Sequence, residues 1–156
     1  LTKVLPSVCI FTIGAMCAVS PMVKMHTLGS TFVPSGFHAG GLRYHGMAPQ
    51  VSHLLDLGHL EAIAVQQLET FSAGLQFARA EGILPAPEAN HAVAGAIREA
   101  LRCKEEGRSE TILFNLCGHG HFDMQAYTDF QAGKLKDYEY SDEEVAMALA
   151  GLPSVG

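Results

Sequence analysis

The chain has 156 residues, of which 48% are hydrophobic and 17% are charged, and its formal net charge is −6. This length fits one domain, and the hydrophobic share is enough to build a core, so the composition is not that of a disordered protein. The acidic charge argues against binding to nucleic acid or to an anionic membrane surface. The cysteines form no CxxC pair and are typical of free thiols in a reducing compartment, which predicts a cytoplasmic location.

The chain opens with an almost wholly apolar stretch, residues 4–19, preceded by Lys3. This stretch is shorter than the roughly 20 residues of a membrane-spanning helix and is similar to the apolar part of a signal peptide. A signal or anchor is the weaker alternative, because the chain starts with Leu1 and nothing later is typical of a secreted protein. We therefore expect no membrane association.

Helical and loop signals follow in alternation. Residues 21–29 are predicted to form a short helix that ends at Gly29, and a loop rich in glycine and proline follows over 30–41. The loop continues through 42–49 and contains Arg, Tyr and His. These side chains suit a functional loop and a loop that only packs on the protein equally well. Apolar residues at helical spacing then predict helical segments over 50–57, 59–80, 88–103 and 122–133.

Two further signals concern the ends of helices. Pro85 and Pro87 forbid one continuous helix across this region. Near the end of the chain, Ser141 and Glu144 have the form of a capping box before a helix over 145–152.

The most informative stretch is TILFNLCGHGHFD, residues 111–123. Residues 111–116 have the composition of a buried parallel strand, and the glycines that follow break the pattern. Ligands of α/β sheets lie beyond the carboxyl ends of strands, so Cys117 would point at a bound group. The alternative is a tight turn with a buried cysteine, and the pattern alone leaves both open. Helix, loop and strand in this order predict an α/β fold with helices packed on a partial parallel sheet.

Two other chemistries are weaker alternatives for this stretch. Zinc could use His119, His121 and Asp123, but no further ligand stands at a defined place, so we expect no metal site. Cys117 could act as a nucleophile, but the spacing places neither imidazole against the sulfur. Glu81 is an isolated polar residue in an apolar setting, and its position also suits a surface glutamate at a helix end.

Three blocks carry a resemblance to a known family: residues 40–49, 81–92 and 113–123. Together they resemble the carboxy-terminal part of a tryptophan synthase beta chain of the beta-like (type 2) subfamily, from about residue 21 to about residue 136. The resemblance implies a pyridoxal-phosphate enzyme of fold type II that condenses L-serine with indole to give tryptophan. It also implies a homodimer in the complete enzyme, with an alpha subunit as a further partner.

The resemblance assigns roles to individual residues. Cys117 occupies the place of a serine that donates to the pyridine nitrogen of the cofactor, and Gly118 allows a close approach to the ring. Glu81 matches a catalytic glutamate beside the ring. Arg43 stands where the main beta-chain group has an aspartate that meets the substrate hydroxyl, and Tyr44 follows it on the same loop.

The family's Schiff-base lysine and its phosphate-binding glycine loop have no counterpart in this sequence. We therefore expect a fragment with three parts: an atypical segment over 1–20, the synthase-like part over 21–136, and an acidic cap and helix over 137–156. Alone, this chain is expected to make no tryptophan. One alternative is a non-catalytic fragment that needs a complementing half. Another is a different fold-type-II lyase, such as a serine or threonine dehydratase, but the arginine-bearing loop argues against the dehydratase.

Overall fold

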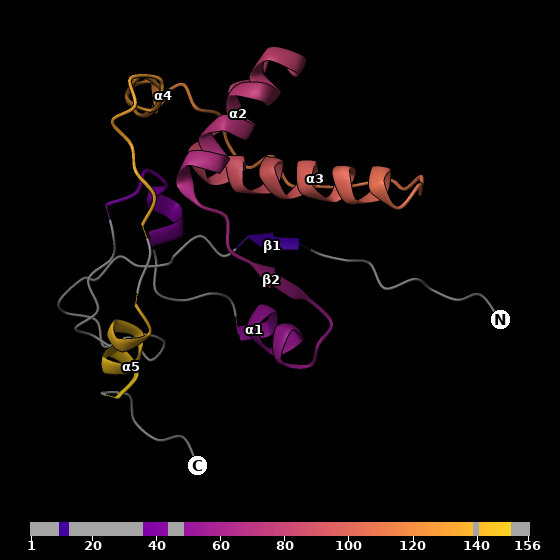
Figure 1. The fold of residues 1–156 in the computed structure, drawn as a ribbon, viewed down its shortest axis with the longest axis vertical. Coiled ribbons are helices and arrows are strands. Elements are labelled where there is room, and N and C mark those ends of the chain that lie inside the picture. The colour runs from indigo at the N-terminus through magenta and orange to yellow at the C-terminus, as the bar shows by residue number, and fades with distance from the viewer. Residues whose placement is uncertain (1–9, 13–35, 44–48, 139–140, 151–156) are drawn as a thin grey trace.

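The computed structural model describes residues 10–12, 36–43, 49–138 and 141–150. Within them lie the strands β1 (Ile10–Thr12) and β2 (Glu61–Ile63), the short 3-10 helix η1 (Gly40–Arg43), and the helices α1 (Pro49–Asp56), α2 (Gln67–Glu81), α3 (Pro87–Glu105), α4 (Met124–Gln131) and α5 (Asp142–Ala150) (Figure 1). The helix predicted over 21–29 and most of the apolar stretch 4–19 fall outside these ranges. Among the helices of the described ranges, none combines the length and the hydropathy needed to cross a bilayer.

Helices α2 and α3 form the centre of the described structure and cross near the beginning of α3, as Figure 1 shows. Gly82 ends α2 with a φ of 72°, and its N–H donates to the carbonyl of Ala78. Pro87 begins α3, where a missing N–H costs nothing. The helices approach closely because Gly74 leaves room for Asn90, whose Oδ1 would lie 2.1 Å from a Cβ at position 74.

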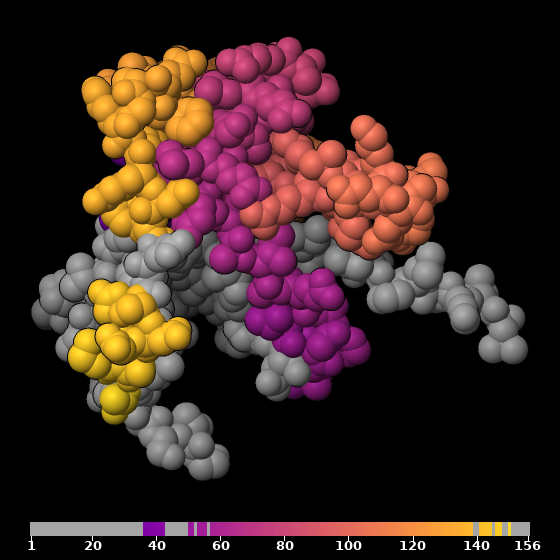
Figure 2. Space-filling model, viewed as in Figure 1, coloured from indigo at the N-terminus to yellow at the C-terminus, as the bar shows by residue number. Residues whose placement is uncertain are grey.

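Two apolar clusters hold these helices in place. One lies between β2, α2 and α3, and buries Val65, Ala73, Val93 and Ala94 with Ile63, Phe77, Ile97 and Phe114 packed against them. The other joins α2 to α4, which lie side by side in Figures 1 and 2, and consists of Phe71, Ala126 and Tyr127 with Leu75, Leu84, Phe130 and Leu135 around them. The far end of α3 projects from this body (Figure 2).

The beginning of α2 is capped by a residue from the far end of the chain. The N–H of Leu68 donates to Asp137 Oδ1 at 2.9 Å, and the side-chain amide of Gln67 donates to the carbonyl of Lys136. Gln67 also accepts a hydrogen bond from the N–H of His38. A carboxylate here meets both the free N–H groups and the positive end of the helix dipole.

The helices predicted over 50–57, 88–103 and 122–133 are confirmed as α1, α3 and α4, with small shifts of their ends. The capping box is also confirmed, since the N–H of Ser141 donates to Glu144 Oε2 and the N–H of Glu144 donates to Ser141 Oγ. The helix predicted from residue 59 is wrong over its first part. Residues 61–63 pair instead with β1, in parallel register with Ile10 opposite Glu61, and helix begins only at Gln67.

The strand predicted over 111–116 is also wrong within the described residues. The segment has no strand assignment, and no backbone hydrogen bond joins residues 109–117 to another described residue. A strand is defined by its ladder, so strand-like composition without a neighbouring strand produces no sheet. The sheet found in the described ranges is the two-stranded pair β1–β2, and the larger parallel sheet that we predicted is not confirmed.

Candidate functional site

The three sequence blocks meet at the beginning of α3. The N–H of Ala86 donates to the carbonyl of Gly118 at 3.1 Å, and the N–H of Gly120 donates to the carbonyl of Leu84 at 2.8 Å. From the other side, the N–H of Gly41 donates to Glu88 Oε1 at 2.8 Å. The blocks around residues 41, 85 and 119 are therefore in direct contact, although long stretches of chain separate them.

The two glycines of the CGHG turn have separate reasons to be there. Gly118 has a φ of 99°, a conformation that residues with a side chain rarely adopt. At Gly120 the limit is space, because a Cβ there would lie 2.4 Å from the carbonyl oxygen of Pro85. The turn can therefore lie directly against residues 84–86 only with glycine at position 120.

A buried polar network supports this contact from behind. The hydroxyl of Tyr127 donates to the carbonyl of Pro85 at 2.6 Å and accepts from Asn90 Nδ2 at 2.9 Å. Tyr127 is 3% exposed and Asn90 is fully buried. Burial raises the pKa of Tyr127 to about 12, so the phenol stays neutral and can donate over the whole physiological range.

We predict that Tyr127→Phe lowers the free energy of unfolding by about 1–3 kcal/mol at neutral pH, because it leaves a buried carbonyl and a buried amide unpaired. The folded-state pKa of Tyr127 lies above its ordinary value near 10, so its contribution is complete below about pH 10 and is lost as the pH rises towards about 12. Urea unfolding at several pH values should show a shallower alkaline loss in the variant.

The matched control for this prediction is Tyr138→Phe. Tyr138 is only partly buried, and its hydroxyl makes no hydrogen bond with another described residue. The control should have the same free energy of unfolding as the unchanged chain at neutral pH. Equal effects of the two substitutions would contradict the role given to the Tyr127 hydroxyl.

Glu81 and Cys117 flank this contact on the chain and are both exposed. Glu81 is the last residue of α2, three residues before Leu84, and Cys117 directly precedes Gly118. The alternative of a buried cysteine in this turn is wrong, since Cys117 is an exposed free thiol. Arg43 ends η1, next to the contact between Gly41 and Glu88, whereas its side chain and the whole of Tyr44 lie outside the described part of the chain.

The electrostatics of the meeting point involve Glu88, to which the sequence analysis assigned no role in the site. Glu88 lies in the first turn of α3 and also binds Gly41. Burial raises the pKa of Asp123, the nearby charge of Glu88 raises it further, and His38 and His119 oppose this shift. Helical periodicity gives no signal for an acidic side chain that binds the backbone of a distant loop, so sequence reasoning missed the contact between Glu88 and Gly41.

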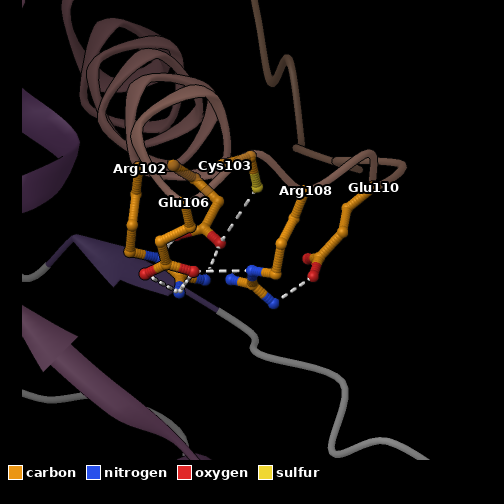
Figure 3. A network of polar contacts seen from close by, with 6 residues as sticks. Arg102, Cys103, Glu106, Arg108 and Glu110 are labelled. Carbon is orange, nitrogen blue, oxygen red and sulfur yellow. Dashed lines mark hydrogen bonds and ion pairs between the residues drawn. The ribbon is translucent and has the colours of Figure 1, made fainter.

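Possible metal ligands occur in two places in the described residues. In the turn, His119 Nδ1 accepts a hydrogen bond from the backbone N–H of His121 at 3.2 Å. One ring nitrogen of the two histidines considered as zinc ligands is therefore already hydrogen-bonded. At the end of α3, Glu99, Cys103 and Glu110 place one ligand atom each within 4.8 Å of one another. Figure 3 shows that Arg102 and Arg108 bind the carboxylates of this second group and of Glu106. The guanidinium groups already neutralise these acids, so the group is an ion-pair network.

Curated proteins of known family are similar to most of this chain. It is 54% identical over 127 residues to tryptophan synthase beta chain 2 of Aquifex aeolicus (strain VF5), which covers 81% of this chain. It is 51% identical over 129 residues to the tryptophan synthase beta chain of Thermococcus gammatolerans, and 51% identical over 125 residues to tryptophan synthase beta chain 2 of Methanosarcina acetivorans. The chain spans 29%, 29% and 28% of the lengths of these relatives. No protein-family model matches the chain.

Proposed function

Because this chain is homologous to tryptophan synthase beta chains over 81% of its length, we propose that it supplies the carboxy-terminal part of an active site that joins L-serine to indole. The observation that carries the proposal is the meeting of the three blocks at the beginning of α3. The three blocks lie far apart in the sequence, and each resembles the family by itself. In the structure they contact one another through Gly41, residues 84–88 and residues 118–120. Blocks that belong to one functional site are expected to lie together in the structure, whereas blocks that resemble the family by chance are not.

Pyridoxal phosphate, when bound, supplies an electron sink for bond changes at the substrate. We assign Cys117 as the hydrogen-bond donor to its ring nitrogen, Gly118 as the point of close approach and Glu81 as the acid beside the ring. The exposure of Glu81 and Cys117 fits these roles, since neither side chain is hydrogen-bonded to another described residue. A thiol is a neutral, weak donor, so it leaves the ring nitrogen uncharged. An uncharged ring withdraws electrons from the substrate less strongly than a protonated one.

The rest of the proposal concerns the substrate, the partners and the parts of the chain. Arg43 and Tyr44 belong to the substrate loop, which η1 begins. Residues 21–136 form the synthase-like part, between an atypical segment over 1–20 and an acidic cap and helix over 137–156. The complete enzyme is a homodimer that takes serine and indole and has an alpha subunit as a further partner.

A chimaeric enzyme tests the proposed function. The segment of the Aquifex aeolicus relative that matches this chain is replaced by the sequence of this chain, and tryptophan formation from serine and indole is measured. We expect tryptophan, and we expect Glu81→Gln to lower kcat by about 100-fold or more, as loss of a group that moves a proton does. A folded chimaera that binds the cofactor but makes no tryptophan would overturn the proposal, and release of pyruvate from serine alone would favour a dehydratase.

The chimaera also tests the assignment of Cys117. We predict that Cys117→Ser keeps the rate of tryptophan formation or raises it, because a hydroxyl is a stronger neutral donor than a thiol. Cys117→Ala, which removes the donor, should lower the rate and serves as the control. If Cys117→Ser instead costs as much activity as removal of the cofactor-binding lysine of the relative, the thiol acts covalently and the assignment is wrong.

A further inference from the structure

Glu88 lies at the beginning of α3, where the three blocks meet, and its side chain binds a segment outside its own helix. It is the second residue of α3 and is half-buried. An acid in this place commonly meets the free N–H groups or the positive end of the dipole of its own helix. Among the described residues, however, the hydrogen bond of its carboxylate goes to the backbone N–H of Gly41, at 2.8 Å. Glu88 therefore holds a loop that lies 47 residues earlier in the chain.

The side chain of Glu88 also packs closely along the backbone of Gly41. A Cβ added at Gly41 would lie 3.3 Å from Glu88 Cγ and 3.4 Å from Glu88 Oε1, which is tighter than an ordinary van der Waals contact. A larger residue at position 41 would therefore require the carboxylate to shift.

The segment that Glu88 holds is too short to be stable by itself. It is η1, a 3-10 helix of four residues that ends at Arg43. Helices of this kind have poor internal hydrogen-bond geometry and occur as short connectors. Among the described residues, no other hydrogen bond joins η1 to one of the α-helices. The place of η1 relative to α3 therefore depends on the bond from Gly41 to Glu88.

The residues before η1 are anchored separately, at the beginning of α2. The N–H of His38 donates to Gln67 Oε1 at 3.1 Å, and the flanking Phe37 and Ala39 are buried. These contacts fix where the loop begins. The bond to Glu88 then fixes the direction in which the backbone continues towards Arg43.

The same turn of α3 holds the CGHG turn. The N–H of Ala86 donates to the carbonyl of Gly118 at 3.1 Å, and Ala86 stands only two residues before Glu88. One rigid helix end therefore carries both hydrogen bonds. Together they set the backbone of Arg43 at a defined place relative to Cys117 and Gly118.

We propose that Glu88 is a positioning residue, which holds η1 against α3 and thereby determines how tightly the site binds L-serine. This inference rests on the proposed function, which assigns Arg43 to the substrate loop. Glu88 acts through the backbone of Gly41 and does not itself touch the substrate. When the bond is lost, η1 is free to move relative to the CGHG turn, so the affinity for L-serine falls while the groups around the cofactor keep their places.

Hydrogen exchange on the whole 156-residue chain tests the contact without cofactor or substrates. Glu88→Ala should speed exchange of the Gly41 amide by about tenfold or more, because this N–H loses its acceptor. The amide of His38, which donates to Gln67, should exchange as in the unchanged chain. Glu105→Ala is the matched control, since Glu105 is an exposed acid at the other end of α3, and it should change neither amide.

The chimaera tests the consequence for the substrate. The affinity for L-serine is measured from the absorbance change of the bound cofactor, together with kcat and the KM for indole. Glu88→Ala should weaken L-serine binding by about tenfold, as loss of a hydrogen bond to a charged group does, and should change kcat and the KM for indole by less than about twofold. Glu105→Ala should change none of these values. A merely structural role of Glu88 would instead lower cofactor binding, kcat and both substrate affinities together.

Two conservative variants separate the position of the side chain from its charge. Glu88→Gln keeps the length and an acceptor oxygen, so it should bind L-serine within about threefold of the unchanged chimaera. Glu88→Asp keeps the charge but is one methylene shorter, so it should resemble Glu88→Ala. The reverse order would mean that the charge acts through the dipole of α3, and the positioning role would be wrong.

The remaining outcomes separate this inference from the proposed function. An unchanged Gly41 amide in Glu88→Ala overturns the inference. If the chimaera makes tryptophan and Glu88→Ala binds L-serine normally, the proposed function stands and the role of Glu88 fails. If the chimaera makes no tryptophan but binds L-serine, and Glu88→Ala weakens that binding, the role of Glu88 stands and the proposed function fails. A chimaera that binds the cofactor but not L-serine overturns both.

Discussion

Phe71→Ala should lower the free energy of unfolding by about 3–5 kcal/mol, the largest effect that we expect from a single side chain. Phe71 is fully buried in α2, and its ring lies 5.0 Å from that of Tyr127 and 5.6 Å from that of Phe130, measured between centroids. The substitution removes the contacts that join α2 to α4 and leaves a cavity in their place. Denaturant unfolding followed by circular dichroism measures the loss.

Phe122→Ala is the matched control, since it deletes the same atoms from a side chain that is 93% exposed. We expect it to change the free energy of unfolding by no more than about 0.5 kcal/mol. Similar losses for the two variants would mean that the cluster around Phe71 does not hold α4 on α2.

Gly120→Ala should lower the free energy of unfolding by about 1–3 kcal/mol or more, as overpacking against a rigid neighbour does. The new Cβ would lie 2.4 Å from the carbonyl oxygen of Pro85, which is backbone and is itself held by Tyr127. Relief of the clash requires the turn to move away from residues 84–86, so the hydrogen bond from Gly120 to Leu84 should lengthen. Faster hydrogen exchange at the amide of residue 120 would report that movement.

The control for this prediction is Gly40→Ala. An added Cβ at Gly40 meets no atom within 4 Å, and its φ is not in the left-handed region. We expect stability equal to that of the unchanged chain or slightly higher, because alanine restricts the unfolded chain more than glycine does. A Gly120→Ala variant as stable as Gly40→Ala would show that the turn does not lie against residues 84–86.

The sequence predicted well those features that depend on neighbours along the chain. Apolar periodicity located α3, and prolines at 85 and 87 marked the break before it, because both signals act within a few residues. The capping box at Ser141 was predicted for the same reason. The resemblance supplied the three blocks, and the contacts of residues 85 and 119 then brought two of them together.

Features that depend on distant partners were not predictable in this way. Local periodicity predicts helix for residues 61–63, because their pairing with Ile10–Thr12 leaves no mark in the neighbouring sequence. Residues 111–116 have the composition of a strand, but composition does not supply a neighbouring strand. Glu88 lies in the first turn of α3, and its contact with Gly41 spans a loop and a helix that no periodicity connects.

The cap of α2 has a consequence for the order in which the chain folds during synthesis. Leu68 donates to Asp137, a residue 69 positions later in the sequence, so the first turn of α2 lacks this cap until Asp137 has left the ribosome. The hydroxyl of Tyr127, which holds Pro85, also arrives late. Contacts of such long sequence separation form slowly, because loop closure must precede them. The contact between residues 84–86 and 118–120 is therefore completed only after Tyr127 has been synthesised, and until then residues 84–86 stay accessible to chaperones and proteases.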